Sequence, residues 1–402
     1  MIEIPNLRHL RVFLVAARVR RLGRAAVMVH LSQPAATQAI RKLEAHLGHA
    51  LFERTSVGLN PTEAGTCFQV RIERAFRWLD QGQRVLGGGA MSWPGQVTRV
   101  QLRALISMVQ HGGYGLAARR LGVSQPGLHR AVRELEAVCG QRLFLPTPQG
   151  VEATAAAREL ARLAALALAE IVQGMAELRE RQGILDGTVW VGCLPLARTR
   201  LLPDAVTHLL NRYPDVKMRI VDGSYGELLQ GLRHGQIDMI VGALREPAPF
   251  PDILQEALFT EPLSIVVRAG HPILAANELD AACLSRLAWV VPREGTPARD
   301  HFEAFFRVSG VEPPQRLVEC SSMVATRALL LESDRAGMMS QEQVRYEVAA
   351  GFLAVLPKAL QGTERPIGLT VRSGWQPTIV QARMMSLLRD ICRSAGRPAE
   401  VS

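Results

Sequence analysis

The sequence predicts a multidomain chain with two similar, mostly α-helical units, a long helix after each unit, and an α/β half with two lobes. Three observations favour this fold class. The chain has 402 residues, which is more than one compact core usually holds. The stretch SQPGLHRAVRELE at 124–136 repeats SQPAATQAIRKLE at 32–44. After residue 187, short apolar runs alternate with amphipathic stretches.

Composition limits the class of protein. Hydrophobic residues make up 48% and charged residues 21%, which is typical of a folded soluble protein. No apolar run reaches the roughly 18 residues of a membrane span, and the N-terminus lacks the basic-then-apolar order of a signal peptide. Six cysteines without a CxxC pair indicate neither a zinc site nor a disulfide framework. We therefore expect a cytoplasmic protein that uses no metal and no cofactor and has no membrane partner.

Charge is unevenly distributed along the chain. Residues 1–183 carry 24 Lys and Arg against 13 Asp and Glu, whereas residues 184–402 carry 23 against 24. The excess positive charge therefore lies in the repeated part, which favours a polyanion as its partner. An arginine-rich surface without a specific partner is the alternative.

The repeat has an offset of 92 positions, and 16 of the 38 positions from Ala25 to Thr62 are identical in the two copies. In the first copy, apolar spacing predicts a first helix, a short second helix that opens at Ala25, and a third helix capped by Ser32 and ended by Gly48. Two short apolar stretches flank residues 54–58, which predicts a small hairpin. The third helices have matching apolar faces, namely Ala36, Ile40, Leu43 and Leu47 in the first copy and Leu128, Val132, Leu135 and Cys139 in the second.

Three short helices and a hairpin make a winged helix-turn-helix. The third helix of such a domain fits the DNA major groove, about 12 Å wide, and presents polar residues to base edges and phosphates. Glutamine can bond adenine with two hydrogen bonds, and arginine can bond guanine or a phosphate. The predicted contacts to double-stranded DNA are Ser32, Gln33, Pro34, Thr37, Gln38, Arg41 and Arg54 in the first copy, and Ser124, Gln125, Pro126, His129, Arg130 and Arg133 in the second.

Paired alanines, SQPA, a helix ending in LE, and then LG, LFER and PTEAG follow one another within AAVMVHLSQPAATQAIRKLEAHLGHALFERTSVGLNPTEAG. This combination resembles the DNA-binding domain of LysR-type transcriptional regulators. The second copy resembles the same domain through GLAARRLGVSQPGLHRAVRELE and RLF. Family members usually have one such domain, so the duplication is a departure. In the second copy Pro146 replaces the arginine of LFER, and Val57 and Gln149 replace an arginine common at the wing tip.

These departures leave two interpretations of the second copy. It is either a second DNA-binding unit or a module for packing or dimerisation. A long helix follows each copy, at about 62–85 and 154–182, and the second has a nearly heptad stripe from Leu160 to Leu178 that favours a partner helix. In the family this linker helix pairs across a dimer. We expect that the two helices of this chain pair with each other, which makes one chain a pseudo-dimer. The competing arrangement is pairing of equivalent helices between two chains of a homo-oligomer.

The second half is expected to form α/β sheets. Strands are predicted near 188–194, 216–224, 236–244, 262–270, 287–292, 336–340, 353–356 and 367–372, with helices near 199–213, 225–234, 297–309, 322–333, 340–349 and 377–393. LLPDAVTHLLNRYPDVKMRIVDG, LLQGLRHGQIDMIVG and HPIL resemble the effector-binding domain of the same family, which has the periplasmic-binding-protein fold. The resemblance implies a discontinuous lobe at about 188–262 plus 365–402, a second lobe at about 263–364, and a small-molecule effector between them.

The resemblance also implies which residues contact the effector. Arg293 is a candidate charge partner for an anionic ligand, whereas each serine is interpreted equally well as a helix cap. The implied effector-site residues are Leu194, Pro195, Leu196, Gly223, Ser224, Arg293, Gly295, Thr296, Ser321 and Ser322.

Together these patterns predict a ligand-responsive transcriptional regulator with RNA polymerase as a further partner to consider. No catalytic motif is present, so no enzyme is predicted. The alternatives are an α/β half that is a plain small-molecule binding protein, and helix-turn-helix units that are only interaction modules. The predicted domains are winged helix-turn-helix domains at 1–62 and 97–153, a linker helix and loop at 62–90, a linker helix at 154–183, and an effector-binding domain at 184–402.

Overall fold

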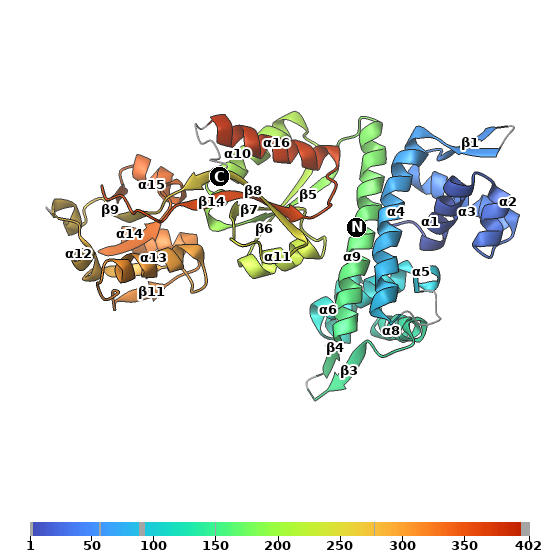
Figure 1. Cartoon of the computed structure of the whole chain (residues 1–402), viewed down its shortest axis with the longest axis horizontal. Helices are drawn as coiled ribbons and strands as arrows, with labels where there is room; N and C mark the ends of the chain where they lie inside the picture. Colours follow the sequence, from blue (N-terminus) through green and yellow to red (C-terminus); the bar gives the residue numbers. More distant parts are fainter. Residues whose placement is uncertain (1–2, 56–57, 88–92, 149, 277, 395–402) are drawn as a thin grey trace.

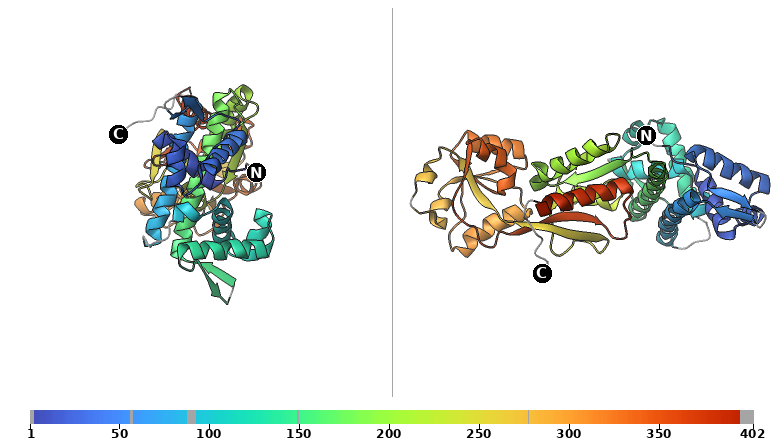
Figure 2. Two further views of the ribbon diagram at one scale, coloured as in Figure 1. Left: turned by 90° about the vertical axis from the view of Figure 1, so that its right-hand side faces the viewer. Right: turned by 90° about the horizontal axis from the view of Figure 1, so that it is seen from above.

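The computed structural model describes residues 3–55, 58–87, 93–148, 150–276 and 278–394. The first helical unit lies at one end, two long helices stand in the middle, and two α/β lobes follow at the other end (Figure 1). Seen from above, the lobes and the helical part form one elongated row (Figure 2). Among the helices of the described residues, none combines the length and the apolar character needed to cross a membrane.

The first unit has the predicted order of three helices and a hairpin. The third helix is confirmed at both ends, because the Ser32 hydroxyl accepts a hydrogen bond from the backbone N–H of Ala35 at 3.3 Å and Gly48 ends the helix with a φ of 69°. The predicted start of the second helix is wrong. It begins at Leu22, because Arg20 adopts a left-handed φ of 54° and turns the chain directly after the first helix. The elements are α1 (Leu7–Val19), α2 (Leu22–Met28), α3 (Gln33–Leu47), β1 (Phe52–Thr55) and β2 (Gly58–Pro61).

The second unit repeats this order and one of its internal contacts. In the first unit, Glu44 Oε1 accepts a hydrogen bond from the backbone N–H of Leu51 at 2.8 Å. In the second, Glu136 Oε1 accepts one from Leu143 at 2.8 Å. The glutamate of each LE motif therefore joins the third helix to the hairpin. The elements are α6 (Arg99–His111), α7 (Tyr114–Leu121), α8 (Gln125–Cys139), β3 (Phe144–Thr147) and β4 (Gly150–Ala153).

The glycine-rich connection between the units ends in a packed helix. The sequence predicts a flexible break over 86–95, of which 88–92 lie outside the described residues. From Trp93 onward that prediction is wrong, because the short helix α5 (Trp93–Gln96) begins there and the Trp93 side chain is only 1% exposed. A Cβ added to Gly82 would lie 2.8 Å from Trp93 Nε1 and 3.0 Å from Leu160 Cδ2. The indole therefore packs into a space that is open only because residue 82 has no side chain.

The long helices α4 (Glu63–Val85) and α9 (Ala155–Arg181) pack against each other antiparallel. Glu63 at the start of α4 is ion-paired with Arg181 at the end of α9, and Gly82 near the end of α4 faces Leu160 near the start of α9. A Cβ on Gly174 would lie 2.9 Å from Arg71 Cβ, so the two helices approach each other closely at this glycine. One apolar core runs through both units and both long helices, so the repeated part folds as a single body.

The α/β half contains two five-stranded sheets with the strand orders β6-β5-β7-β14-β8 and β11-β10-β12-β9-β13. Because β14 comes from near the end of the chain, the first lobe is discontinuous, and the chain crosses between the lobes after β8 and again after β13. The strands are β5 (Thr188–Cys193), β6 (Lys217–Asp222), β7 (Met239–Ala243), β8 (Ile253–Glu261), β9 (Ser264–Arg268), β10 (Ala288–Val291), β11 (Leu317–Glu319), β12 (Arg335–Met339), β13 (Leu353–Val355) and β14 (Arg365–Arg372).

Two strands and one helix of this half were not predicted. β8 lacks simple alternation, because its pairing with β14 shifts register between Ile367 and Gly368. β11 has only three residues, and α12 (Ala281–Ser285) only five. The helix expected at 340–349 is a 3₁₀ turn, η3 (Gln341–Val344), followed by α15 (Arg345–Ala349). The remaining helical segments are η1 (Pro195–Arg198), α10 (Leu201–Arg212), α11 (Tyr225–Arg233), η2 (Pro272–Ala275), α13 (Pro297–Val308), α14 (Met323–Leu331) and α16 (Ile379–Ser394).

Candidate nucleic-acid interface and effector site

The exposed face of α3 carries most of the residues predicted to contact DNA in the first unit. Gln33, Gln38 and Arg41 are exposed, and so is Pro34 in the first turn. Two other residues use their hydroxyl groups within the helix. Ser32 is its N-cap, and the half-buried Thr37 donates a hydrogen bond to the carbonyl of Gln33 at 2.9 Å. The helix therefore presents two amides and one guanidinium on one side, opposite its apolar face.

The face of α8 is similar, with one difference. Ser124 caps the helix by accepting a hydrogen bond from the N–H of Gly127 at 3.2 Å. The His129 ring stacks on Tyr114 of α7, with ring centroids 4.6 Å apart at 28°. The first unit has Leu22 and Thr37 at these two positions and so has no such stack. The exposed residues of the α8 face are Gln125, Pro126, His129, Arg130 and Arg133.

The first glutamine of each third helix lies over the preceding helix in the same way. A Cβ added to Gly23 would lie 3.4 Å from Gln33 Oε1, and a Cβ added to Gly115 would lie 3.8 Å from Gln125 Oε1. Because the preceding helices α2 and α7 have glycine at this point, the amide of each glutamine lies close to their backbone. A glycine lies ten positions before each glutamine in the sequence, and this repeated spacing could have predicted the close approach.

The two hairpins are attached differently. In the first unit, the N–H of Leu59 donates to the carbonyl of Arg20 at 2.9 Å, and a Cβ on Gly58 would lie 2.6 Å from that oxygen. A Cβ on the equivalent Gly150 would meet nothing within 4 Å. The first hairpin therefore closes on the end of α1 and the second stands free of the end of α6.

The wing residues singled out from the sequence are only partly placed. The backbone of Arg54 pairs with Leu59 in the hairpin, and Pro146 pairs with Val151 in the second hairpin and is exposed. The side chain of Arg54 lies outside what the structure describes. The wing-tip residues Val57 and Gln149 lie outside the described residues as well.

In the first lobe, the predicted effector residues follow β5 and β6, two neighbouring parallel strands. The side chains of Leu194 and Leu196 are 8% and 6% exposed and belong to apolar cores, whereas Pro195 between them is exposed. Ser224, next to Gly223, caps α11 and donates its N–H and its hydroxyl to Glu227 Oε2, at 2.8 Å each. These hydrogen bonds hold the pKa of Glu227 below its usual range. Ser224 thus has the helix-capping role that was the alternative to ligand contact.

In the second lobe, the predicted residues follow β10 and β11, which are also parallel neighbours. Because the carboxyl ends of such strands meet at one edge of the sheet, Arg293 Nη2 lies 3.5 Å from Ser321 Oγ and donates to it. Ser322 caps α14 by accepting from the N–H of Ala325 at 3.3 Å. Gly295 has a φ of 72°, and Thr296 donates its hydroxyl to the carbonyl of Arg293 at 2.8 Å. Of the residues predicted in this lobe, Arg293 and Ser321 are therefore brought into side-chain contact by the fold.

Three further polar residues of this half were missed by sequence reasoning. The Arg245 guanidinium lies over the Tyr225 ring at 4.7 Å from its centroid. Among the described residues, the buried Tyr225 hydroxyl and Nε and Nη2 of the buried Arg365 have no hydrogen-bond partner. Burial lowers the pKa of Arg365 to about 10. Buried donors without partners are groups that a polar ligand can satisfy. In the sequence, these residues could have been noticed only as one arginine shortly after β7 and another at the start of β14.

Across the lobes, charges approach one another. Arg293 of the second lobe adds to the Ser224 hydrogen bonds in lowering the pKa of Glu227 in the first. Arg327 of α14 donates to Thr199 Oγ1 at 3.3 Å, which also joins the two lobes. In the part of the chain that the structure describes, no group of three or more His, Cys, Asp or Glu is arranged to hold a metal ion. The pairs that approach across this junction are thus Arg293 with Glu227 and Arg327 with Thr199.

Comparison with known proteins gives matches over most of the chain. The model of the LysR substrate binding domain matches residues 182–393, and the model of the bacterial regulatory helix-turn-helix protein of the lysR family matches twice, at residues 7–66 and 100–158. The HTH-type transcriptional regulator GalR of Pseudomonas putida is 34% identical over 392 residues, which cover 97% of this chain and 98% of the relative.

Solved structures share the fold over about three quarters of this chain. A full-length OxyR variant from Pseudomonas aeruginosa superposes with a TM-score of 0.56 at 24% identity, covering 76% of this chain and 99% of that chain. Full-length CbnR in complex with its target DNA superposes with a TM-score of 0.50 at 23% identity, covering 72% of this chain and 98% of that chain. On the family models and the GalR alignment, the chain belongs to the LysR family of bacterial regulatory helix-turn-helix proteins.

Proposed function

We propose that this chain is a ligand-responsive transcriptional regulator that binds double-stranded DNA with two winged helix-turn-helix domains. The domains are 1–62 and 97–153, the linker helices lie within 62–90 and 154–183, and residues 184–402 bind the effector. A regulator of transcription acts where the bacterial chromosome is, so the cytoplasm is its proposed location. No catalytic step is part of the proposal.

The observation that carries the proposal is the repeated exposed polar face of α3 and α8. Gln33 and Arg41 recur 92 positions later as Gln125 and Arg133, all four exposed. The GalR alignment spans 97% of the chain and so includes both copies. Two polar helices on one body, within a segment that holds the excess positive charge, fit a duplex with two half-sites. Linking two weak contacts in one chain raises the effective concentration of the second.

The effector is proposed to be a small anion held between the lobes. Arg293 with Ser321 offers donors from the second lobe, and Arg245 and Arg365 lie in or near the first. A carboxylate or similar group there would satisfy the guanidinium nitrogens of Arg365 that lack partners. Effector binding would favour one spacing of the two lobes. That change would reach α9, because Glu180 of α9 accepts hydrogen bonds from the first N–H groups of α16 in the first lobe.

A second candidate role applies to the second unit alone. His129 is stacked on Tyr114, Pro146 stands in the wing, and the hairpin is not closed against α6 in the way the first is closed against α1. These features favour a unit whose main role is to pack against α9 or against another chain of a homo-oligomer.

A gel-shift assay with promoter fragments tests the proposal. Wild-type protein should shift selected fragments at physiological salt, whereas a Gln33→Ala/Arg41→Ala variant should bind them at least tenfold more weakly. Arg77→Ala is the matched control, because Arg77 is an exposed arginine of α4 outside both polar faces. Equal binding of specific and unrelated fragments by the folded wild-type protein would reject the proposal in favour of an interaction module.

A further inference from the structure

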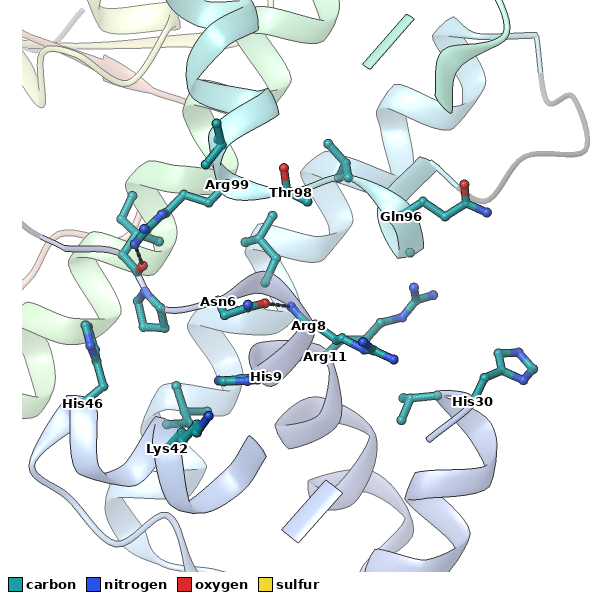
Figure 3. A pocket seen from close by; sticks show the side chains of 18 of the residues that line it. Asn6, Arg8, His9, Arg11, His30, Lys42, His46, Gln96, Thr98 and Arg99 are labelled. Atoms are coloured by element: carbon teal, nitrogen blue, oxygen red, sulfur yellow. Dashed lines mark hydrogen bonds between the residues drawn. The ribbon is translucent and has the colours of Figure 1, made fainter. Parts of the chain in front are cut away.

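A large cavity lies between the first unit and the segment that enters the second (Figure 3). It has a volume of about 960 Å³. Residues 3–11, the end of α2 and the second half of α3 form one wall, and residues 95–100 form the other. The labelled side chains of Arg8 and Arg11 lie between these two walls in Figure 3. The cavity is therefore a junction between the two helical units.

Its lining is strongly basic. Among the lining residues that the structure describes, Glu3 is the one acidic residue, and it is ion-paired with Arg99 at 3.6 Å. Within the described ranges, Arg8 and Lys42 form no ion pair with any carboxylate. The pKa of His9 is lowered by burial first and then by Lys42 and Arg8, as expected beside uncompensated positive charge. The cationic or ionisable basic lining residues are Arg8, His9, Arg11, His30, Lys42, His46 and Arg99.

The second copy shows that the fold does not require these charges. At the positions equivalent to Arg8, His9, His30, Lys42 and His46, it has Val100, Gln101, Gly122, Glu134 and Val138. Only Arg11 has a basic equivalent, Arg103. Both copies nevertheless form the same three helices and hairpin. The basic cluster is therefore a property of this cavity and not of the helix-turn-helix core.

We propose that this cavity binds a phosphate-bearing anion. Arginine and lysine without counterions are the side chains that recognise phosphate oxygens, and exposed Gln96 and Thr98 on the opposite wall add polar groups. The lining includes Lys42 and His46 from the second half of α3 but none of the residues predicted to contact base edges, and no residue of α8 or of the lobe junction. A phosphate here would contact the first unit and Arg99 together, and so would reinforce the hydrogen bond from Arg99 to the carbonyl of Ile4 that already joins the two units.

The phosphate has two sources with the same chemistry. Lys42 directly follows Arg41 on α3, so the backbone of bound DNA is one source. A free phosphorylated small molecule is the other, since the cavity volume exceeds that of a single phosphate group several-fold. Binding of a free anion is measured without DNA, so its outcome does not depend on the proposed regulatory function.

The test compares three full-length proteins: wild type, Arg8→Gln/Lys42→Gln, and the matched control Arg77→Gln. Inorganic pyrophosphate is titrated into each protein by calorimetry, and the salt dependence of duplex binding is measured by gel shift. Thermal unfolding without ligand checks that the three proteins are equally folded. We expect this because the second copy folds with Val100 and Glu134 at the positions of Arg8 and Lys42.

If a free phosphorylated small molecule is the source, wild type and control should bind pyrophosphate, and the double variant should bind it at least tenfold more weakly. If DNA is the source, log affinity should fall less steeply with log salt in the double variant. The magnitude of the negative slope should be smaller by about 2, since each neutralised phosphate contributes about −0.9 to it. If the double variant matches Arg77→Gln in both the pyrophosphate titration and the salt slope, the cavity binds no phosphate and the proposal is overturned.

Discussion

Arg71 Nη1 donates a hydrogen bond to Glu170 Oε2 at 2.9 Å across the seam between α4 and α9. The two side chains are 2% and 7% exposed. Arg71 is also ion-paired with Glu177 and donates to the carbonyl of Gln376 in the α/β half at 2.9 Å. One buried guanidinium thus holds together both linker helices and the first lobe.

Removing this guanidinium should strongly destabilise the protein. Arg71→Ala removes the buried guanidinium that Glu170 and Glu177 share and leaves Glu170 paired with Arg74 alone, and breaking a buried pair in this way costs about 3–5 kcal/mol. The free energy of unfolding, measured by denaturant titration, should fall by that amount. Arg77→Ala on the exposed side of the same helix should change it by less than about 0.5 kcal/mol. Equal stabilities for the two variants would show that α4 and α9 do not meet at Arg71.

Asp238 should make the stability of the first lobe depend on pH. Burial raises the pKa of this carboxyl from 3.8 to about 6, although it accepts a hydrogen bond from the N–H of Trp190 at 2.8 Å and lies near Arg372. Between these two values the folded chain binds a proton that the unfolded chain has lost. The contribution to stability is therefore present below about pH 4 and is lost as the pH rises through about 6, on the order of 3 kcal/mol at about 1.4 kcal/mol per unit.

The variant Asp238→Asn isolates this effect. Asparagine carries no charge at any pH, and its carbonyl can still accept from Trp190. The free energy of unfolding of the variant, relative to wild type, should rise between pH 4 and pH 7 in urea titrations at fixed ionic strength. A difference that is the same at every pH would mean that Asp238 does not titrate in this range.

The glutamates that join the third helices to the hairpins should have equivalent effects. Glu44→Ala leaves the N–H groups of Leu51 and Phe52 without their acceptor, and Glu136→Ala does the same to Leu143. Each substitution should cost about 1.5–3 kcal/mol, the range for hydrogen bonds to charged groups. Glu44→Gln keeps an acceptor oxygen and is the control, expected to recover at least half of that stability. Chemical unfolding of the three variants measures this, and a destabilisation confined to one copy would contradict the equivalence of the two units.

Local signals explain what could be predicted from the sequence. The third helices follow from a serine N-cap, an apolar stripe and a C-terminal glycine, all within about 17 residues of each copy. The strands of the α/β half other than β8 and β11 follow from short apolar runs. These features depend on neighbouring residues along the chain, so they are visible without the tertiary structure.

The features that were missed depend on distant parts of the chain. The buried Trp93 lies against Gly82 of α4 in the core that both long helices share, and β8 owes its irregular pattern to a register shift in β14. Arg71 is one arginine among many in a basic segment, and only the antiparallel packing of α4 on α9 brings two carboxylates to it. Arg365 becomes a candidate effector-binding residue only through its burial without full hydrogen bonding.

Footprinting on an operator fragment tests the central claim, that both units of one chain bind DNA, most directly. Wild-type protein should protect two segments, and a Gln125→Ala/Arg130→Ala/Arg133→Ala variant should protect only one, with binding weakened by about 1–3 kcal/mol for each side chain that recognises a base. The stabilities of the two proteins should be alike, because all three side chains are exposed. A footprint of unchanged length and affinity would show that the second unit does not bind DNA.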